Sequence, residues 1–235
     1  MHDPIVIRRR FRGPPESGNG GYSCGILGVR FDEPVEVMLR VPPPLETSLA
    51  VEARPGGGLA ATHEGAVVIE AHPVTFEDPT PEGVSLRDAE RAAASFEGFT
   101  NHAFPGCFVC GPEREIGDGL RIFPGSLAGG IAAAPWTPDA SVGSSEGTVL
   151  PEVVWAALDC PTGWATYYAA AEGEISLLGR MSARILRPIR VGETYIAAGW
   201  AAGRDGRKHF ATSAILSAAG EPHAWSHATW VELKA

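Results

Sequence analysis

The sequence predicts an α+β protein of two similar units, each a helix followed by an antiparallel sheet, with the two sheets joined edge to edge. Three observations lead to this fold class. The C-terminal part of the chain holds three consecutive β-rich runs, a helix start precedes them, and the first half repeats the same order of elements. With 235 residues, the chain is long enough for two units of roughly 100 residues each.

The clearest elements lie in the second half. The runs TYIAAGWAA, KHFATSAILSA and PHAWSHATWVEL within 194–232 are separated by glycine-containing turns, which predicts an antiparallel meander. The run ISLLGRMSARILRPIRVGE ahead of them predicts a further strand that ends near Pro188. A helix is expected to begin at Pro151, because proline suits the first helical position and the following Glu152 suits the positive end of the helix dipole. A strand pair is expected over 119–136, ahead of this helix.

The first half shows the same plan in weaker form. A short apolar stretch, GGYSCGILGVRF, stands in the place of the helix, and strands are predicted at IVIRRRF, VEVMLRV, SLAVEAR, GLAATHEG and AVVIEAH. At residue level, MLRVPPPLET (38–47) aligns with ILRPIRVGET (185–194) without a gap and agrees at four of ten positions. These features indicate an internal duplication.

A Pro-rich linker joins the two halves. It leads into a helix expected at about 85–97, with Ser85 as the N-terminal cap. We therefore divide the chain into an N-terminal unit at 1–75, a linker at 76–118 that holds this helix and the CFVCG loop, and a C-terminal unit at 119–235. Joining the two sheets at their edges hides two strand edges that would otherwise be exposed.

Composition and charge exclude several classes of protein. The net charge of −9 and isoelectric point near 5.3 give no basic surface for nucleic acid, so we expect no nucleic-acid partner. No apolar run approaches the roughly 20 residues of a membrane helix. The N-terminal stretch also lacks the apolar segment of a secretory signal, so we expect a cytoplasmic protein with no membrane partner. The four cysteines are too few for a disulfide scaffold at this size and are expected to stay reduced.

Two segments carry a resemblance to a known family. The segment 147–165, GTVLPEVVWAALDCPTGWA, and the segment 105–125, which contains CFVCG, resemble hotdog-fold acyl-CoA thioesterases of the PaaI-like type, here as a single-chain double hotdog. In this family the helix segment runs Gly-Ile-Val-His-Gly-Gly, followed by six residues and then an acidic residue. Asp159 falls on that acidic position, and the resemblance implies that it is the catalytic base or nucleophile.

The second half departs from the family pattern at the start of this helix. Leu150, Pro151 and Glu152 stand where the family has His-Gly-Gly. In the family a backbone N–H of that turn stabilises the oxyanion of the thioester, because a helix start presents unpaired donors and a positive dipole end. Pro151 has no N–H, so this turn cannot form the usual oxyanion hole.

The first half departs in the complementary way. Asn19, Gly20 and Gly21 stand at the His-Gly-Gly position, but the acidic position holds Gly28. In PaaI-like dimers the turn of one subunit faces the acid of the other, so Gly20 and Asp159 are expected to make one complete site. An ordinary Asn-Gly turn and a solvent-facing helix residue are the alternative interpretations of these two features taken singly.

The pair Cys107 and Cys110 can hold a metal only with further ligands. A structural zinc site takes four, and His72 and His102 are the only other candidates nearby in the sequence. We therefore interpret the two cysteines as buried thiols of a loop that packs against the core. No bound metal and no cofactor are expected.

The resemblance implies an acyl-CoA thioesterase-like hydrolase whose partner is acyl-CoA or another small thioester. The residues expected to carry the reaction are Asp159, Gly20 and Asn19. The residues expected to bind the substrate, with the arginines meeting the phosphates of coenzyme A, are Gly21, Ser176, Arg187 and Arg190.

Two other functions stay open. The missing His and the presence of Pro151 favour a non-catalytic protein that binds acyl groups or acyl-CoA. The segment NHAFPG (101–106) resembles the His-Phe-Pro-Gly loop of hotdog dehydratases and hydratases, although His102 is followed by alanine. The oligomeric state is open as well, a homo-oligomer included.

Overall fold

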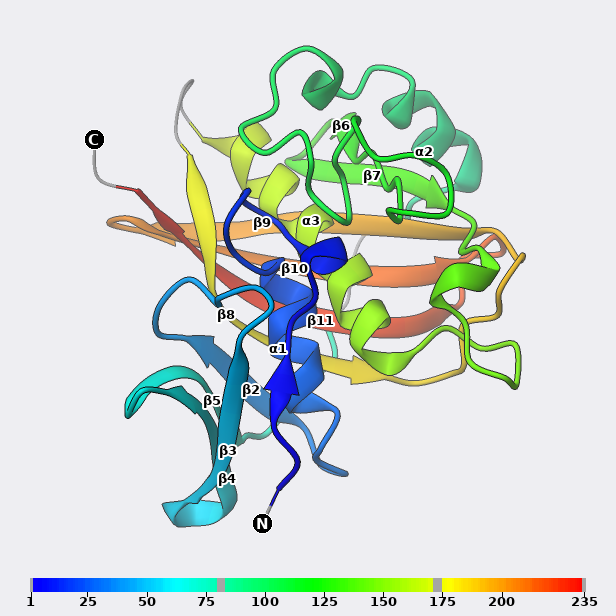
Figure 1. The fold of residues 1–235 in the computed structure, drawn as a ribbon. Coiled ribbons are helices and arrows are strands. Elements are labelled where there is room, and N and C mark those ends of the chain that lie inside the picture. The colour runs from blue at the N-terminus through cyan, green and yellow to red at the C-terminus, as the bar shows by residue number, and fades with distance from the viewer. Residues whose placement is uncertain (1, 80–82, 171–174, 234–235) are drawn as a thin grey trace.

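The N-terminal half folds into a short strand, a helix and four further strands (Figure 1). The computed structural model describes residues 2–79, 83–170 and 175–233 of the chain. The elements of this half are β1 (Ile5–Val6), α1 (Gly20–Gly28), β2 (Val35–Leu39), β3 (Ser48–Arg54), β4 (Gly58–His63) and β5 (Ala66–Pro73), with 3-10 turns at Arg9–Phe11 and Pro55–Gly57.

The linker and the C-terminal half supply the other elements. In the linker, α2 (Leu86–Ala93) begins after Ser85, whose hydroxyl accepts a hydrogen bond from the Asp88 N–H at 3.1 Å. This is the predicted cap, and the helix ends earlier than the expected 97. The elements that follow are β6 (Gly125–Leu127), β7 (Ile131–Trp136), α3 (Pro151–Ala169), β8 (Ser176–Ile185), β9 (Tyr195–Asp205), β10 (Lys208–Ser217) and β11 (Pro222–Glu232), with 3-10 turns at Glu97–Phe99 and Ala140–Val142.

The named strands form one sheet that runs through both halves. Its order is β1-β3-β4-β5-β2-β8-β11-β10-β9-β7-β6. The order β1-β3-β4-β5-β2 of the first half is repeated, from the opposite edge, by β7-β9-β10-β11-β8 of the second half. The halves meet where β2 pairs with β8 in antiparallel register, with Val37 opposite Met181. The predicted α+β fold of two helix-plus-sheet units joined edge to edge is confirmed.

The strand pair predicted over 119–136 is partly wrong. The segment 119–123 is not a strand, because its backbone pairs with the preceding loop instead, the Leu120 N–H donating to the Phe108 carbonyl at 2.8 Å. The strand that precedes β7 and pairs with it is β6, which begins only at Gly125. The hydrogen bonds from 119–123 to the preceding loop attach the loop that contains CFVCG to the C-terminal half.

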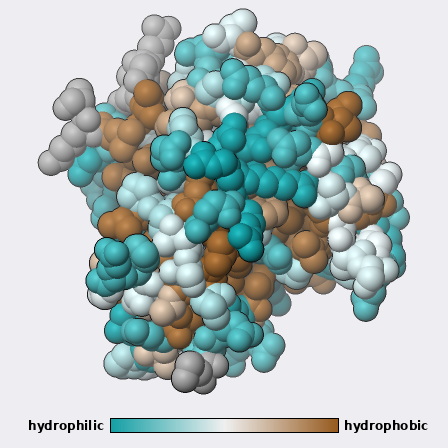
Figure 2. Space-filling view, viewed as in Figure 1, coloured by the Kyte–Doolittle hydropathy of each residue, from teal (hydrophilic) through white to brown (hydrophobic). Residues whose placement is uncertain are grey.

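The first predicted strand is shorter than the run IVIRRRF. β1 ends at Val6, and the chain then turns where the Arg9 N–H donates to the Glu46 carboxylate at 2.6 Å. Arg8 forms an ion pair with the same carboxylate at 3.1 Å. Figure 2 shows hydrophilic residues gathered over the middle of this face, where the turn after β1 lies in Figure 1. Basic residues of this turn are thus neutralised within the molecule.

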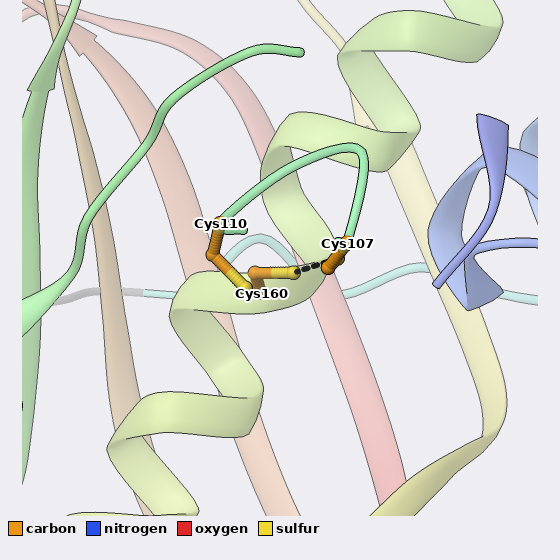
Figure 3. A group of neighbouring side chains, drawn as sticks. All are labelled: Cys107, Cys110 and Cys160. Atoms are coloured by element: carbon orange, nitrogen blue, oxygen red, sulfur yellow. Dashed lines mark hydrogen bonds between the residues drawn. The ribbon is translucent and has the colours of Figure 1, made fainter. Parts of the chain in front are cut away.

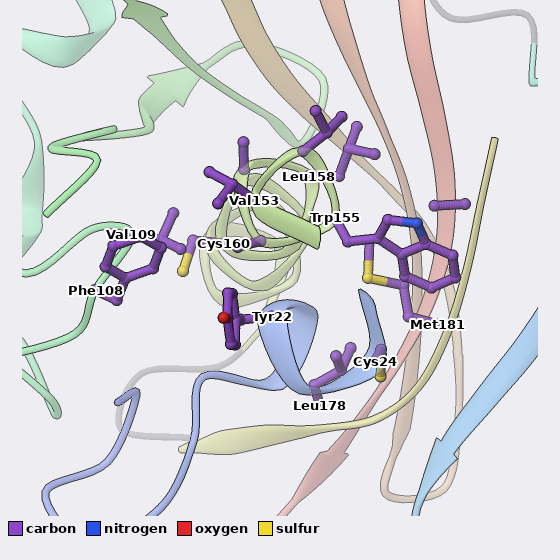
Figure 4. Packing of buried hydrophobic residues seen from close by; sticks show 14 of the residues in the cluster. Tyr22, Cys24, Phe108, Val109, Val153, Trp155, Leu158, Cys160, Leu178 and Met181 are labelled. Atoms are coloured by element: carbon purple, nitrogen blue, oxygen red, sulfur yellow. The ribbon is translucent and has the colours of Figure 1, made fainter. Parts of the chain in front are cut away.

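Helices α1 and α3 pack closely against each other, and three glycines of α1 allow the approach. A Cβ atom on Gly25 would lie 2.7 Å from Trp155 Cβ, and one on Gly28 would lie 2.8 Å from the Trp155 ring. A Cβ atom on Gly21 would overlap Asp159. Figure 4 shows the buried side chains that surround the two helices. The contact offsets the poor helix propensity of glycine and brings the two halves together at their helices.

Helix α2 covers the opposite face of the sheet. Ala89 of α2 belongs to a small core with Ile131 and Ala133 of β7, whereas Ala132 and Ala134 of the same strand belong to the main core with α3. The alternation follows from the period of two along a strand. No helix in the described ranges is long and apolar enough to cross a membrane.

Candidate active site

Asp159 lies in the middle of α3 and is only 1% exposed. Its Oδ2 atom accepts two hydrogen bonds from the first half of the chain, from the Gly21 N–H at 2.8 Å and from Asn19 Nδ2 at 3.0 Å. The acidic position of the second half therefore meets the Asn-Gly-Gly turn of the first half. The Gly21 N–H, which the sequence assigns to substrate, is directed to Asp159 here.

Asn19 positions the start of α1 and the carboxylate at the same time. It is the N-cap of α1, because its Oδ1 atom accepts the Tyr22 N–H at 2.9 Å. That bond orients the amide so that Nδ2 points to Asp159. Gly20 is the first helical residue, and N–H groups in a first turn have no partner within the helix. Leu178 packs against Gly20, where a Cβ atom would lie 2.8 Å from Leu178 Cβ.

The second carboxylate oxygen of Asp159 has a different environment. Among the described residues, Oδ1 is buried and has no hydrogen-bond partner. Burial raises the pKa of Asp159 from its ordinary 3.8 to about 7, although the hydrogen bonds from Gly21 and Asn19 lower it. An unpaired oxygen on a carboxyl group that titrates near neutrality is able to accept a proton from a reacting molecule.

A pocket of about 600 Å³ lies beside this carboxylate. Asp159, Asn19 and Gly20 line it, together with residues of the loop 101–110 and of β8. Its aromatic lining residues are Phe104, Trp164, Tyr167 and Trp230. The size and the apolar wall suit a small organic ligand, with a few polar groups at one end.

A smaller pocket of about 300 Å³ occupies the equivalent place beside Pro151. The segments before α3 and after β8 line it, as parts of 13–18 and 39–43 line the large pocket. None of the residues that line it is acidic. At Gly28, where the acid is missing, the Trp155 ring fills the space. The two clefts therefore differ in size and in chemistry.

Comparison with solved structures identifies this architecture. A protein of unknown function with a hotdog fold from Alicyclobacillus acidocaldarius is similar at a TM-score of 0.64 and 11% identity, over 99% of this chain and 93% of that one. The chain is a double hotdog. The tesB protein of Mycobacterium avium subsp. paratuberculosis is similar at a TM-score of 0.60 and 14% identity, over 94% of this chain and 89% of that one.

Another solved structure is similar to part of this chain only. A thioesterase superfamily protein matches 61% of this chain and 67% of its own length, at a TM-score of 0.50 and 23% identity. No family model and no curated protein matches the sequence. The hotdog fold expected from the helix segment around Asp159 is confirmed by the solved structures.

The double hotdog separates the residues expected to bind substrate. Ser176 begins β8 and lines the large pocket. Arg187 lines the small pocket instead, and Arg190 lines neither of the two pockets described above. Ser176 and the two arginines lie far apart because they flank opposite ends of β8, whose 10 residues span about 30 Å. The structure does not bring these two arginines to Asp159.

Two other arginines line the large pocket, Arg40 and Arg207. Arg40 forms an ion pair with Glu70. Arg207 lies in the turn between β9 and β10, where its Nη1 atom donates to the Glu232 carbonyl at 2.9 Å. Nothing in the sequence around Arg207 signals this position, because only the pairing of β10 with β11 brings the turn to the pocket.

Three cysteine thiols meet at the wall of the same pocket (Figure 3). Cys107 and Cys110 come from the loop before β6, and Cys160 comes from α3, next to Asp159. All three are buried. Hydrogen bonds from the Cys110 and Cys160 thiols hold the pKa of the Cys107 thiol well below its usual range. The sequence motif indicates only Cys107 and Cys110, and the one available signal for Cys160 is its place beside the predicted acid.

Proposed function

We propose that this double hotdog hydrolyses thioesters in the large pocket, with Asp159 as the group that acts on the substrate. The observation that carries the proposal is the environment of this carboxyl group. One oxygen is held by Asn19 and Gly21, the other is buried and unpaired, and the residue lines a largely apolar pocket. Acyl-CoA is the proposed substrate class, because the pocket combines an apolar wall for an acyl chain with the exposed Arg207.

The proposed reaction places the thioester carbonyl at the N-terminus of α1. The Gly20 N–H and the positive end of the helix dipole stabilise the negative charge that develops on the carbonyl oxygen. Asp159 Oδ1 either takes a proton from a water molecule that attacks the carbonyl carbon, or attacks that carbon itself and is released by water afterwards. On both routes the C–S bond breaks, and the leaving thiolate takes up a proton.

The burial of Asp159 supports catalysis over simple binding. Removing a carboxylate from water costs free energy, and an apolar binding pocket gains nothing from that cost. Burial raises the pKa of Asp159 to about 7, which matches the carboxyl group to proton transfer near neutral pH. These properties favour an enzyme over a non-catalytic acyl-CoA-binding protein.

The test is hydrolysis of a panel of acyl-CoA thioesters that includes an enoyl-CoA. Asp159→Asn is expected to lower kcat by roughly a hundredfold or more, as for the loss of a general base. The fold should survive, because the new amide oxygen can accept the same bonds from Asn19 and Gly21. Glu152→Gln is the matched control in the first turn of the same helix, and its turnover should stay within a few-fold, since Glu152 meets the helix dipole.

Three results would contradict the proposal. Unchanged turnover in Asp159→Asn would remove this residue from the mechanism. Binding of a non-hydrolysable acyl-CoA analogue at one site per chain, without turnover of any thioester, would identify a binding protein. Conversion of the enoyl-CoA without hydrolysis of the saturated thioesters would identify a hydratase.

A further inference from the structure

The cluster of Cys107, Cys110 and Cys160 has no role in the proposed hydrolysis. Its three sulfur atoms lie within 4.8 Å of one another, and Cys107 Sγ is 3.8 Å from Cys160 Sγ. In a tetrahedral zinc site with Zn–S bonds of about 2.3 Å, two sulfur ligands lie about 3.8 Å apart. The thiols therefore stand close to the separation that a single thiophilic divalent ion requires.

N–H groups point at these sulfur atoms. Asn19 Nδ2 lies 3.9 Å from Cys107 Sγ and donates to it. Neutral thiols that pack as small hydrophobic groups do not need such donors, whereas thiolates bound to a metal are stabilised by them. The surroundings of Cys107 are therefore suited to negative charge on sulfur.

His102 adds a donor to the same surroundings. Its Nδ1 atom accepts the Phe104 N–H at 3.0 Å, so the neutral ring carries its proton on Nε2, which lies 3.3 Å from Cys110 Sγ. The ring thus donates to the Cys110 sulfur and is not itself a ligand through Nε2. Zinc sites with three protein ligands keep the fourth position for water or substrate.

We propose that Cys107, Cys110 and Cys160 bind one Zn²⁺ ion as three thiolates, with the fourth coordination position open to the large pocket. All three residues line that pocket, which gives a fourth ligand a route to the ion. The loop before β6 supplies two ligands and α3 supplies the third. The ion therefore ties the linker to the helix that carries Asp159.

The test uses the full chain, reduced and freed of metal. Titration with Zn²⁺ should reach one ion per chain, and Co²⁺ in its place should give the visible absorption bands of a tetrahedral thiolate site. Cys160→Ser is expected to lose the Co²⁺ bands and to bind Zn²⁺ at least tenfold more weakly. Cys24→Ser is the matched control, because Cys24 is a buried free cysteine outside the cluster, and this variant should bind like the unchanged chain.

A small thiol tests the open position. 2-Mercaptoethanol is expected to shift the Co²⁺ bands as its sulfur enters the fourth position, and unshifted bands would overturn an open site. Failure of the reduced chain to retain Zn²⁺ would overturn the metal site. Full Zn²⁺ binding by a Cys160→Ser chain with a native circular dichroism spectrum would overturn it as well. None of these measurements uses thioester hydrolysis, so the two proposals fail independently.

Discussion

The starts of α1 and α3 occupy equivalent places in the two hotdog units and have diverged in opposite directions. Asn19 caps α1, binds Asp159 through its side chain and is followed by a glycine with a backbone N–H. Leu150 makes no side-chain cap bond at the start of α3, and Pro151 follows it without an N–H. The difference teaches that the buried carboxyl group and the turn that binds it come from different units of the double hotdog.

The largest effect is expected when the start of α1 is made like the start of α3. Gly20→Pro removes the proposed oxyanion donor and should lower kcat by about a hundredfold or more. Proline is tolerated at a first helical position, and the extended backbone of Asn19 is compatible with a following proline. The measurement is steady-state hydrolysis of the best acyl-CoA substrate.

Gly20→Ala is the matched control for that change. It adds the same Cβ atom against Leu178 but keeps the N–H, so any loss from crowding is common to both variants. The proposed donor role predicts that the proline variant is much slower than the alanine variant. Equal activities of the two variants would show that the Gly20 N–H does not contribute.

A smaller effect, on the free energy of unfolding, is expected from substitutions at the second residues of α1 and α3, Gly21 and Glu152. In Gly21→Ala the new Cβ atom would overlap Asp159 and lie 2.7 Å from the Trp155 carbonyl oxygen. Because backbone of α3 cannot move aside easily, the free energy of unfolding should fall by about 1–3 kcal/mol. Glu152→Ala, at the equivalent position of α3, should lower it by less than about 1 kcal/mol, the size of an interaction with the helix dipole.

Urea unfolding of both variants provides the measurement. The close contact of α1 with α3 is the reason for the difference, so an equal loss in Gly21→Ala and Glu152→Ala would contradict it. The result also reports on the site, because the N–H of Gly21 holds Asp159 Oδ2.

The smallest effect concerns the arginines of the two pockets. Arg207→Ala should raise KM for acyl-CoA by about three- to fivefold, the size expected for an exposed ion pair with a phosphate. Arg187→Ala, in the small pocket, should leave KM unchanged. An acyl thioester of N-acetylcysteamine lacks the phosphates, and its KM should respond to neither change. A KM rise in Arg187→Ala alone would place the substrate in the other cleft.

The sequence predicts those parts of the double hotdog that depend on local patterns. The glycine turns between β9, β10 and β11 and the proline at the start of α3 are signals carried by neighbouring residues. The expected meeting of Gly20 with Asp159 is different, since it came from the family resemblance. In the structure the neighbours of Gly20 make the contact, because Asn19 Nδ2 and the Gly21 N–H donate to Asp159 Oδ2 at 3.0 and 2.8 Å.

The remaining features depend on contacts between distant segments. Nothing near 119–123 signals that this run pairs with the CFVCG loop instead of with β7. Cys160 joins the other two cysteines only because α3 passes beside that loop. Arg207 reaches the large pocket through the packing of a turn, whereas Arg187 and Arg190 are carried away by the length of β8. Such placements are set by tertiary packing and leave no periodic pattern in the sequence.

The Trp155 ring against Gly28 has an evolutionary consequence. An acid at position 28 would overlap that ring, and shrinking Trp155 first would empty part of the core at a cost of about 3–5 kcal/mol. Each of the two single substitutions is therefore harmful before the other has occurred. A second carboxyl group at position 28 would therefore require two coordinated substitutions, and the Trp155 ring keeps the cleft beside Pro151 without an acid.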